Sequence, residues 1–236
     1  MSEVLSMKKL IPVYILVLGA FVCAAVFGSR AVTASTELSR LRARRCIVID
    51  AGHGGEDGGA VSCTGVNESG INLQIALRLE KLLNLLGYDT KMIRFTDTAV
   101  YTQGNTIAEK KVSDLKQRVK LVNETENALL VSIHQNQFSD SRYSGAQVFY
   151  AGDPESKELA VRLQTALVQT LNPDSNRKAK ASSGVYLMEK ITCSGILVEC
   201  GFLSNYAEEA RLQTPEYQKS LCCAIAATLG TFLEGA

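Results

Sequence analysis

The sequence predicts a single α/β domain, with a mixed or mostly parallel sheet of about six strands flanked by helices, preceded by an N-terminal membrane helix. Three observations lead to this prediction. Short runs of β-branched residues alternate with longer segments whose apolar residues recur at helical spacing. The 236 residues suffice for one ordinary domain with a hydrophobic core. Residues 10–28 carry no charged side chain and directly follow Lys8 and Lys9.

The uncharged stretch has the length of a membrane span. A bilayer core takes about 20 apolar residues, whereas the core of a signal peptide takes about 7–15. We therefore expect residues 1–28 to be a retained anchor, with cleavage after Ala34 as the alternative. Residues 29–45 are expected to be a polar, arginine-rich linker, and residues 46–236 the one folded domain. Basic residues flank the stretch on both sides, so charge alone leaves its orientation open.

The first half of the domain predicts two strand–helix repeats. Residues 46–50 are a short β-branched run, which indicates a buried strand. Isoleucines and leucines then recur at helical spacing over residues 71–86, and Gly87 is expected to end that helix. A second strand is expected over residues 91–95, and a second helix over residues 114–124.

The second half predicts four more strands and two more helices. Leucines recur every fourth residue over 155–171, which indicates a helix with one apolar face, and Pro215 is expected to open the last helix. The apolar runs that indicate strands lie at residues 128–134, 147–150, 185–188 and 196–200. Strands that alternate with helices in this way are typical of a mostly parallel sheet.

Composition argues against nucleic acid as a partner. The net charge is +1, tryptophan is absent, and no basic stripe is interleaved with aromatic residues. The seven cysteines include no C-x-x-C pair and fall mostly in apolar runs, so we expect small buried side chains and no disulfide framework.

The chain has only two histidines, and both lie where a ligand site is expected. His53 follows the first predicted strand, and His134 ends the strand at residues 128–134. In open α/β sheets, ligands bind beyond the carboxyl ends of the strands, so the two imidazoles are expected to meet there. The alternative is that each is an ordinary hydrogen-bonded side chain.

Two glutamates are candidates for the same site. Glu68 lies just before the first predicted helix, where its carboxylate can reach His53, or can simply stabilise the helix N-terminus by about 0.3–1 kcal/mol. Glu199 lies inside an apolar strand, where an unpaired carboxylate costs several kcal/mol and needs a metal, a cation or a raised pKa. The alternative is an edge strand with Glu199 facing water. Strand alternation places Cys200 on the opposite face.

A glycine-rich loop surrounds His53. The segment 52–59 holds five glycines but has Asp57 where a dinucleotide-binding loop needs glycine, and no G-K-[ST] follows. The glycines are therefore expected to let the backbone turn sharply and bring His53 to a metal. Two imidazoles and one carboxylate suit catalytic zinc, with one position left for water, and equally suit non-haem iron.

These segments together resemble the zinc-dependent N-acetylmuramoyl-L-alanine amidases of the Amidase_3 type. The resemblance implies one Zn²⁺ per chain, held by His53, Glu68 and His134, with Glu199 as the catalytic carboxylate and peptidoglycan as the substrate. Because that substrate is extracytoplasmic, the catalytic domain is expected outside the cell membrane, or secreted if the N-terminal segment is cleaved. The matching segments are IDAGHGG at 49–55 with DGGA at 57–60, NE at 67–68 with INL at 71–73, SIHQN at 132–136, and VECGFLSN at 198–205.

Within this family the chain is most similar to the members that act in sporulation. They have one catalytic domain, one membrane segment and no wall-binding repeats, and the Gln135–Asn136 pair fits that branch. The resemblance implies that muramic acid residues from which the stem peptide has been removed are then converted to muramic-δ-lactam in the spore cortex. Residues 95–114 are too short for an obvious inhibitory insertion, so we expect control by expression or by a regulatory partner protein.

Three questions stay open at this point. The fold is also compatible with a catalytically silent cell-wall-binding protein, although no expected ligand is missing. A non-haem iron oxygenase fits the ligand set, but such enzymes are usually β-barrels. Arg94, at the end of a predicted strand, is either a substrate contact or a surface ion pair.

Overall fold

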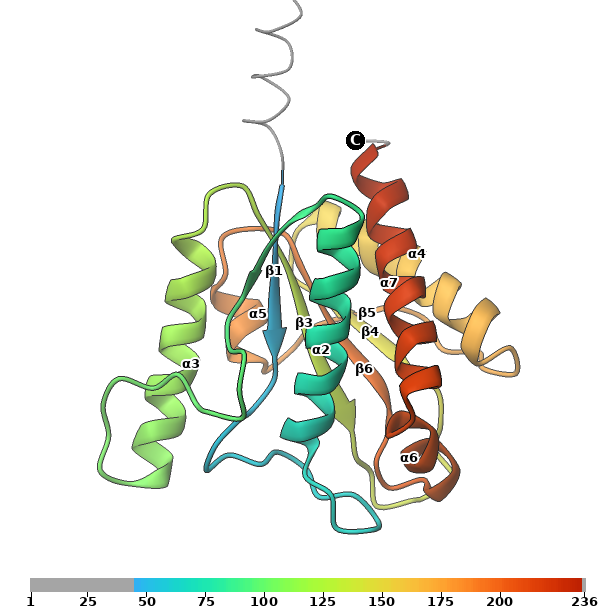
Figure 1. The fold of residues 1–236 in the computed structure, drawn as a ribbon, viewed down its shortest axis with the longest axis horizontal. Coiled ribbons are helices and arrows are strands. Elements are labelled where there is room, and N and C mark those ends of the chain that lie inside the picture. The colour runs from blue at the N-terminus through green and yellow to red at the C-terminus, as the bar shows by residue number, and fades with distance from the viewer. Residues whose placement is uncertain (1–44, 235–236) are drawn as a thin grey trace, which may run out of the picture. The chain divides into compact units, whose positions relative to one another are not determined.

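A six-stranded sheet forms the centre of the computed structural model, which describes residues 45–234 (Figure 1). The strand order is β2-β1-β3-β6-β4-β5, and every neighbouring pair is parallel except β4 and β6. This confirms the predicted mixed, mostly parallel α/β sheet. The strands are β1 (Cys46–Ala51), β2 (Asp89–Met92), β3 (Ala128–Asn136), β4 (Gln147–Tyr150), β5 (Lys180–Ala181) and β6 (Gly195–Phe202).

Helices cover both faces of the sheet. One core layer joins the sheet to α2, α4 and α7, and a smaller layer on the other face joins it to α3 and α5 (Figure 1). The central strands are buried on both faces, which explains why they read as continuous apolar runs instead of alternating patterns. The helices are α2 (Glu68–Leu85), α3 (Ile107–Asn123), α4 (Pro154–Leu171), α5 (Tyr186–Lys190), α6 (Tyr206–Leu212) and α7 (Pro215–Glu234).

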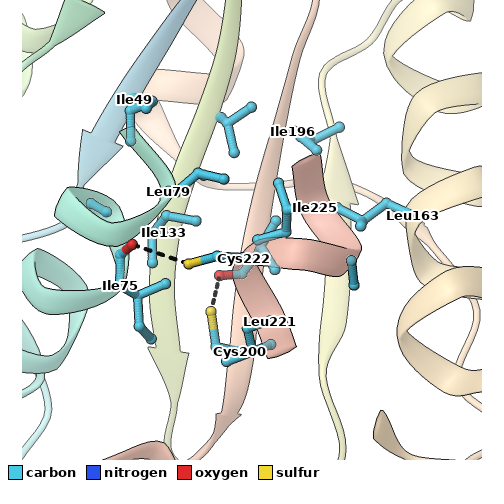
Figure 2. Packing of buried hydrophobic residues seen from close by; sticks show 14 of the residues in the cluster. Ile49, Ile75, Leu79, Ile133, Leu163, Ile196, Cys200, Leu221, Cys222 and Ile225 are labelled. Carbon is cyan, nitrogen blue, oxygen red and sulfur yellow. Dashed lines mark hydrogen bonds between the residues drawn. The ribbon is translucent and has the colours of Figure 1, made fainter. Parts of the chain in front are cut away.

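The larger core layer holds the carboxyl ends of the central strands in place. Figure 2 shows Ile75 of α2 and Ile225 of α7 packed beside Ile133 of β3. Cys222 and Cys200 lie in the same layer, and their thiols donate to backbone carbonyls, as expected of small buried side chains. Each fully buried aliphatic side chain contributes about 1.5–3 kcal/mol, so this layer stabilises the packing of α2 and α7 against β3 and β6.

Local signals explain where two helices begin and end. Gly87 has a left-handed φ of 83°, and the preceding helix α2 stops at Leu85, as predicted. Helix α3 begins at Ile107, seven residues earlier than predicted, because Thr106 and Glu109 form a reciprocal capping box. The capping box stabilises a first turn that has little apolar surface to bury.

The structure also differs from the sequence prediction at several short elements. Residues 185–188 were expected to form a strand, but Val185 is the N-cap of helix α5 and residues 186–188 lie in that helix, which buries Leu187 and Met188 in the smaller core layer. Strand β2 starts two residues earlier than expected, and the short elements β5 and α6 were not predicted. Edge strands and helices of one or two turns carry too few residues to show a period.

The predicted membrane helix at residues 1–28 and most of the linker lie outside the described residues. Between residues 45 and 234, no helix has both the length and the apolar character needed to cross a bilayer.

Candidate metal centre

The two histidines and Glu68 meet at one edge of the sheet, beyond the carboxyl ends of β1 and β3. His53 lies in the loop after β1, Glu68 opens helix α2, and His134 lies near the end of β3. His53 Nε2 lies 3.3 Å from Glu68 Oε2, and His134 Nδ1 lies 3.0 Å from Glu68 Oε1. One ligand atom from each residue lies within 4.8 Å of the other two. The sequence therefore predicted correctly that these three side chains come together.

Glycines let the ligands approach this closely. A Cβ atom at Gly52 would lie 2.2 Å from the His134 ring, and one at Gly59 would lie 2.6 Å from Glu68 Oε2. His53 itself has a left-handed φ of 61°, which costs a non-glycine residue energy and is typical of functional positions. Two imidazoles and a carboxylate are a donor set that catalytic zinc accepts. The close approach that Gly52 and Gly59 allow is consistent with these three side chains binding one zinc ion.

Asp57 orients the imidazole of His53. The Asp57 carboxylate lies 2.9 Å from His53 Nδ1, and the loop is closed by a hydrogen bond from the Gly54 N–H to the Asp57 carbonyl. A carboxylate at Nδ1 favours the tautomer that leaves Nε2 free to bind a metal. This role of Asp57 was not predicted, although its spacing of four residues from His53 within a tight glycine loop is visible in the sequence.

Glu68 is held as an ionised carboxylate. It is 3% exposed and accepts hydrogen bonds from the N–H groups of Ala60 and Gln135 and from the Asn72 amide. Burial raises the pKa of Glu68, but the hydrogen bond and charge of His134, the charge of His53 and the Ala60 N–H together lower it to about 2. The carboxylate is therefore a permanent acceptor with its two oxygens directed at the two rings.

Glu199 lies next to this cluster on the central strand β6. Its backbone pairs in register with His134 of β3, so the edge-strand alternative is wrong. Within the described residues, Glu199 Oε2 is buried and has no hydrogen-bond partner, which is rare because such an atom costs about 1–3 kcal/mol. Burial raises the pKa of Glu199 to about 7, with the negative charge of Glu68 adding to it and His134 opposing it. Cys200 points into the larger core layer, as predicted.

Two buried arginines hold the loop that carries His53. Arg118 pairs with Asp50 and donates to the carbonyls of Ala51 and His53. Arg94 donates to the carbonyls of Ala51, Gly52 and Ser69 and is 3% exposed. Arg94 Nη1 also lies 3.6 Å from Oδ1 of the exposed Asp97, so the ion-pair alternative holds for its partner, although the guanidinium itself is buried against backbone carbonyls.

Comparison with known families identifies the arrangement. The model of the Amidase_3 family, N-acetylmuramoyl-L-alanine amidase, matches residues 47–231. The chain belongs to this family. All four segments that carried the resemblance lie within the matched residues, and the chain is an N-acetylmuramoyl-L-alanine amidase. The iron oxygenase alternative is wrong.

Individual Amidase_3 relatives agree with this assignment. A germination-specific N-acetylmuramoyl-L-alanine amidase of Bacillus subtilis is 39% identical over 183 residues, which is 77% of this chain and 76% of that protein. The CwlD amidase of Clostridioides difficile, solved in complex with the GerS lipoprotein, has a TM-score of 0.79 and 34% identity over 82% of this chain and all of that chain. An N-acetylmuramoyl-L-alanine amidase of Clostridium difficile 630 has a TM-score of 0.69 and 28% identity over 81% of this chain and 97% of that one. The predicted similarity to the sporulation amidases is confirmed.

Proposed function

We propose that the amidase works with one Zn²⁺ held by His53, Glu68 and His134, and with Glu199 as its general base and acid. The observation that carries this proposal is the convergence of three metal-binding side chains beside the half-buried Glu199, whose Oε2 atom is buried and has no hydrogen-bond partner among the described residues. When bound, zinc supplies Lewis acidity that polarises an amide carbonyl and acidifies water.

Glu199 is suited to moving the proton of the reaction. A catalytic group is most effective when its pKa lies near the working pH, and burial raises the pKa of Glu199 above the ordinary value of a glutamate, toward that range. As a carboxylate it receives a proton from the attacking water, and as a carboxylic acid it returns the proton to the amine of L-alanine. The bond that breaks is the amide between the lactyl group of N-acetylmuramic acid and L-alanine. General acid–base help of this kind contributes about 10²–10⁴-fold.

The biological setting that we propose is the maturation of the spore cortex. The B. subtilis relative is described as germination-specific, and the C. difficile relative was solved with a lipoprotein partner. We infer that this chain removes stem peptides from muramic acid before lactam formation, under the control of a partner protein. Deletion of its gene should give spores without muramic-δ-lactam, and normal cortex composition would refute this setting.

We further propose that residues 1–28 anchor the enzyme with the catalytic domain outside the membrane. Strand β1 begins at Cys46 and runs toward the metal centre, so the chain enters the described domain at the edge opposite the site. When the full chain is produced in vegetative cells, protease added to intact protoplasts should remove the domain, and a protected domain would refute the orientation.

Mass spectrometry of purified peptidoglycan tests the activity. Incubation with the full chain and zinc should release stem peptides that begin with L-alanine, leave the glycan strands intact, and stop when zinc is chelated. A Glu199→Gln chain is the matched control and should release none. Binding to peptidoglycan with no released peptide would favour the alternative, a catalytically silent wall-binding protein.

A further inference from the structure

A polar cavity of about 740 Å³ lies at the same edge of the sheet as the metal centre, next to β4, which is two strands away from β3. Its walls come from the segment that leads into β4, the connection from α4 to β5, and helix α6. Gln147, at the start of β4, lines the cavity and pairs in register with Glu199, which pairs in turn with His134. Neighbouring strands are about 4.8 Å apart, so the cavity begins about 10 Å from His134.

The cavity concentrates positive charge in a chain that is nearly neutral. Its lining holds two acidic residues and five basic ones, namely Arg142, Arg177, Lys178, Lys180 and Arg211, while the net charge of the whole chain is +1. One of the acidic residues, Glu208, is 2% exposed and already accepts from the N–H groups of Gly145 and Phe202. Arg142 pairs with Asp140 at 2.7 Å and Arg211 with Glu208 at 3.4 Å. Within the described domain, the charges that these pairs leave uncompensated are those of the remaining three basic residues, Arg177, Lys178 and Lys180.

Arg177 is positioned to bind an anion. Its guanidinium lies over the Phe202 ring, 4.7 Å from the centroid, and it donates to the Ser144 carbonyl and to the Gln147 side chain. Among residues 45–234 none of its partners is a carboxylate, and Lys178 and Lys180 form no ion pair. A guanidinium has five N–H donors in a rigid fork, so Arg177 keeps donors free for a carboxylate.

The other side of the metal centre has no such excess. There the basic residues Lys110 and Lys111 pair with Glu56 and Asp57 at 2.7 Å and 3.2 Å. In the part of the chain that the structure describes, Arg177, Lys178 and Lys180 have no such ion pair, so these three residues make the β4–β5 side of the sheet edge positive, while the charges of Lys110 and Lys111 on the β1 side are balanced. An elongated substrate with one charged and one neutral arm has a preferred direction across this edge.

The substrate of the proposed reaction has those two arms. The glycan is neutral once the lactyl group is amidated, whereas the stem peptide carries free carboxylates from its second residue onward. An extended peptide spans about 3.3 Å per residue, so its second and third residues lie about 7–10 Å from the scissile amide. This matches the distance from the metal centre to the cavity.

We propose that this cavity is the subsite for the stem peptide, in which Arg177, Lys178 and Lys180 bind the free carboxylates of its second and later residues. The inference rests on the proposed function, because it takes the scissile amide to lie at the metal centre. It fixes the orientation of the substrate, with the glycan on the β1 side and the peptide on the β4–β5 side.

Kinetics with two matched muropeptides test the subsite. One is a disaccharide–tetrapeptide with free carboxylates, and the other is the same compound with the carboxylates of its second and third residues amidated. With the full chain and zinc, Arg177→Gln should raise KM for the acidic compound about tenfold, with kcat nearly unchanged and little effect on the amidated compound. Lys178→Gln/Lys180→Gln changes only exposed side chains and should act in the same direction.

A lysine at the other end of α4 provides the control. Lys157→Gln removes an equally exposed charge near the opposite edge of the sheet and should leave KM for both compounds unchanged. Equal KM changes for both compounds, or none, would overturn the subsite while leaving the amidase intact. If Arg177→Gln leaves KM unchanged but loses binding to phosphatidylglycerol vesicles, the cavity binds a lipid surface and the proposed peptide subsite is overturned. A wild-type chain that cleaves neither compound would refute the proposed function itself.

Discussion

Replacing Arg118 with methionine should destabilise the domain more than any surface charge change. Arg118 is 2% exposed and donates to Asp50 and to Asp114, both at 2.5 Å. Asp50 is 1% exposed and keeps only Ser132 as a close side-chain partner once Arg118 is gone. Breaking a buried ion pair from one side costs about 3–5 kcal/mol, because the remaining charge stays buried and unpaired.

Urea unfolding followed by far-UV circular dichroism measures this loss. Lys120→Met is the control from the same helix, since its ion pair with Glu124 is exposed and 3.9 Å long, and it should change the free energy of unfolding by less than about 0.5 kcal/mol. The double variant Asp50→Asn/Arg118→Met removes the stranded charge and should recover part of the loss. A loss below about 1 kcal/mol for Arg118→Met would refute the argument that this pair holds the His53 loop.

Three further predictions follow from the site. Asp57→Asn should weaken zinc binding about 10–100-fold, measured by competition with a chelator, because the His53 tautomer is no longer fixed; unchanged affinity would contradict this. Gly52→Ala should abolish zinc binding in the same assay, because its Cβ would overlap the His134 ring, and a variant with full zinc content would contradict that geometry. Burial opposes the ionised form of Asp50, but Arg118, His134 and Ser132 hold its pKa below the ordinary value. The stabilising contribution of Asp50 is therefore complete above about pH 4 and is lost as the pH falls through that value toward the pKa of the folded state. The free energy of unfolding of Asp50→Asn, measured in urea, should depend less on acid pH than that of the wild type.

The central strands were the part of the fold that the sequence predicted best. Residues 46–50, 128–134 and 196–200 are long apolar runs because helices cover both faces of the sheet, and such runs are visible without any knowledge of partners. Residues 185–188 were predicted as a strand because tyrosine and valine favour strands. In the structure, packing against α3 stabilises a helix there instead.

Some residues of the candidate site could likewise be predicted from the sequence, and others could not. His53 and His134 could be found because parallel strands end at one edge and the chain has no other histidine. Arg118 could not be found, because its partner Asp50 is 68 residues away and an arginine on an amphipathic helix normally faces water. The basic cavity was missed for the same reason, since three separate segments build it.

The most direct test of the account measures zinc content and turnover on one preparation of the Glu199→Gln chain. The three ligands are untouched by this change, so the account predicts about one zinc per chain, as in the wild type, and a loss of turnover of at least about 10²-fold on purified peptidoglycan. Near-normal turnover would contradict the role of Glu199. Loss of the zinc itself would contradict the division between three metal ligands and one proton carrier.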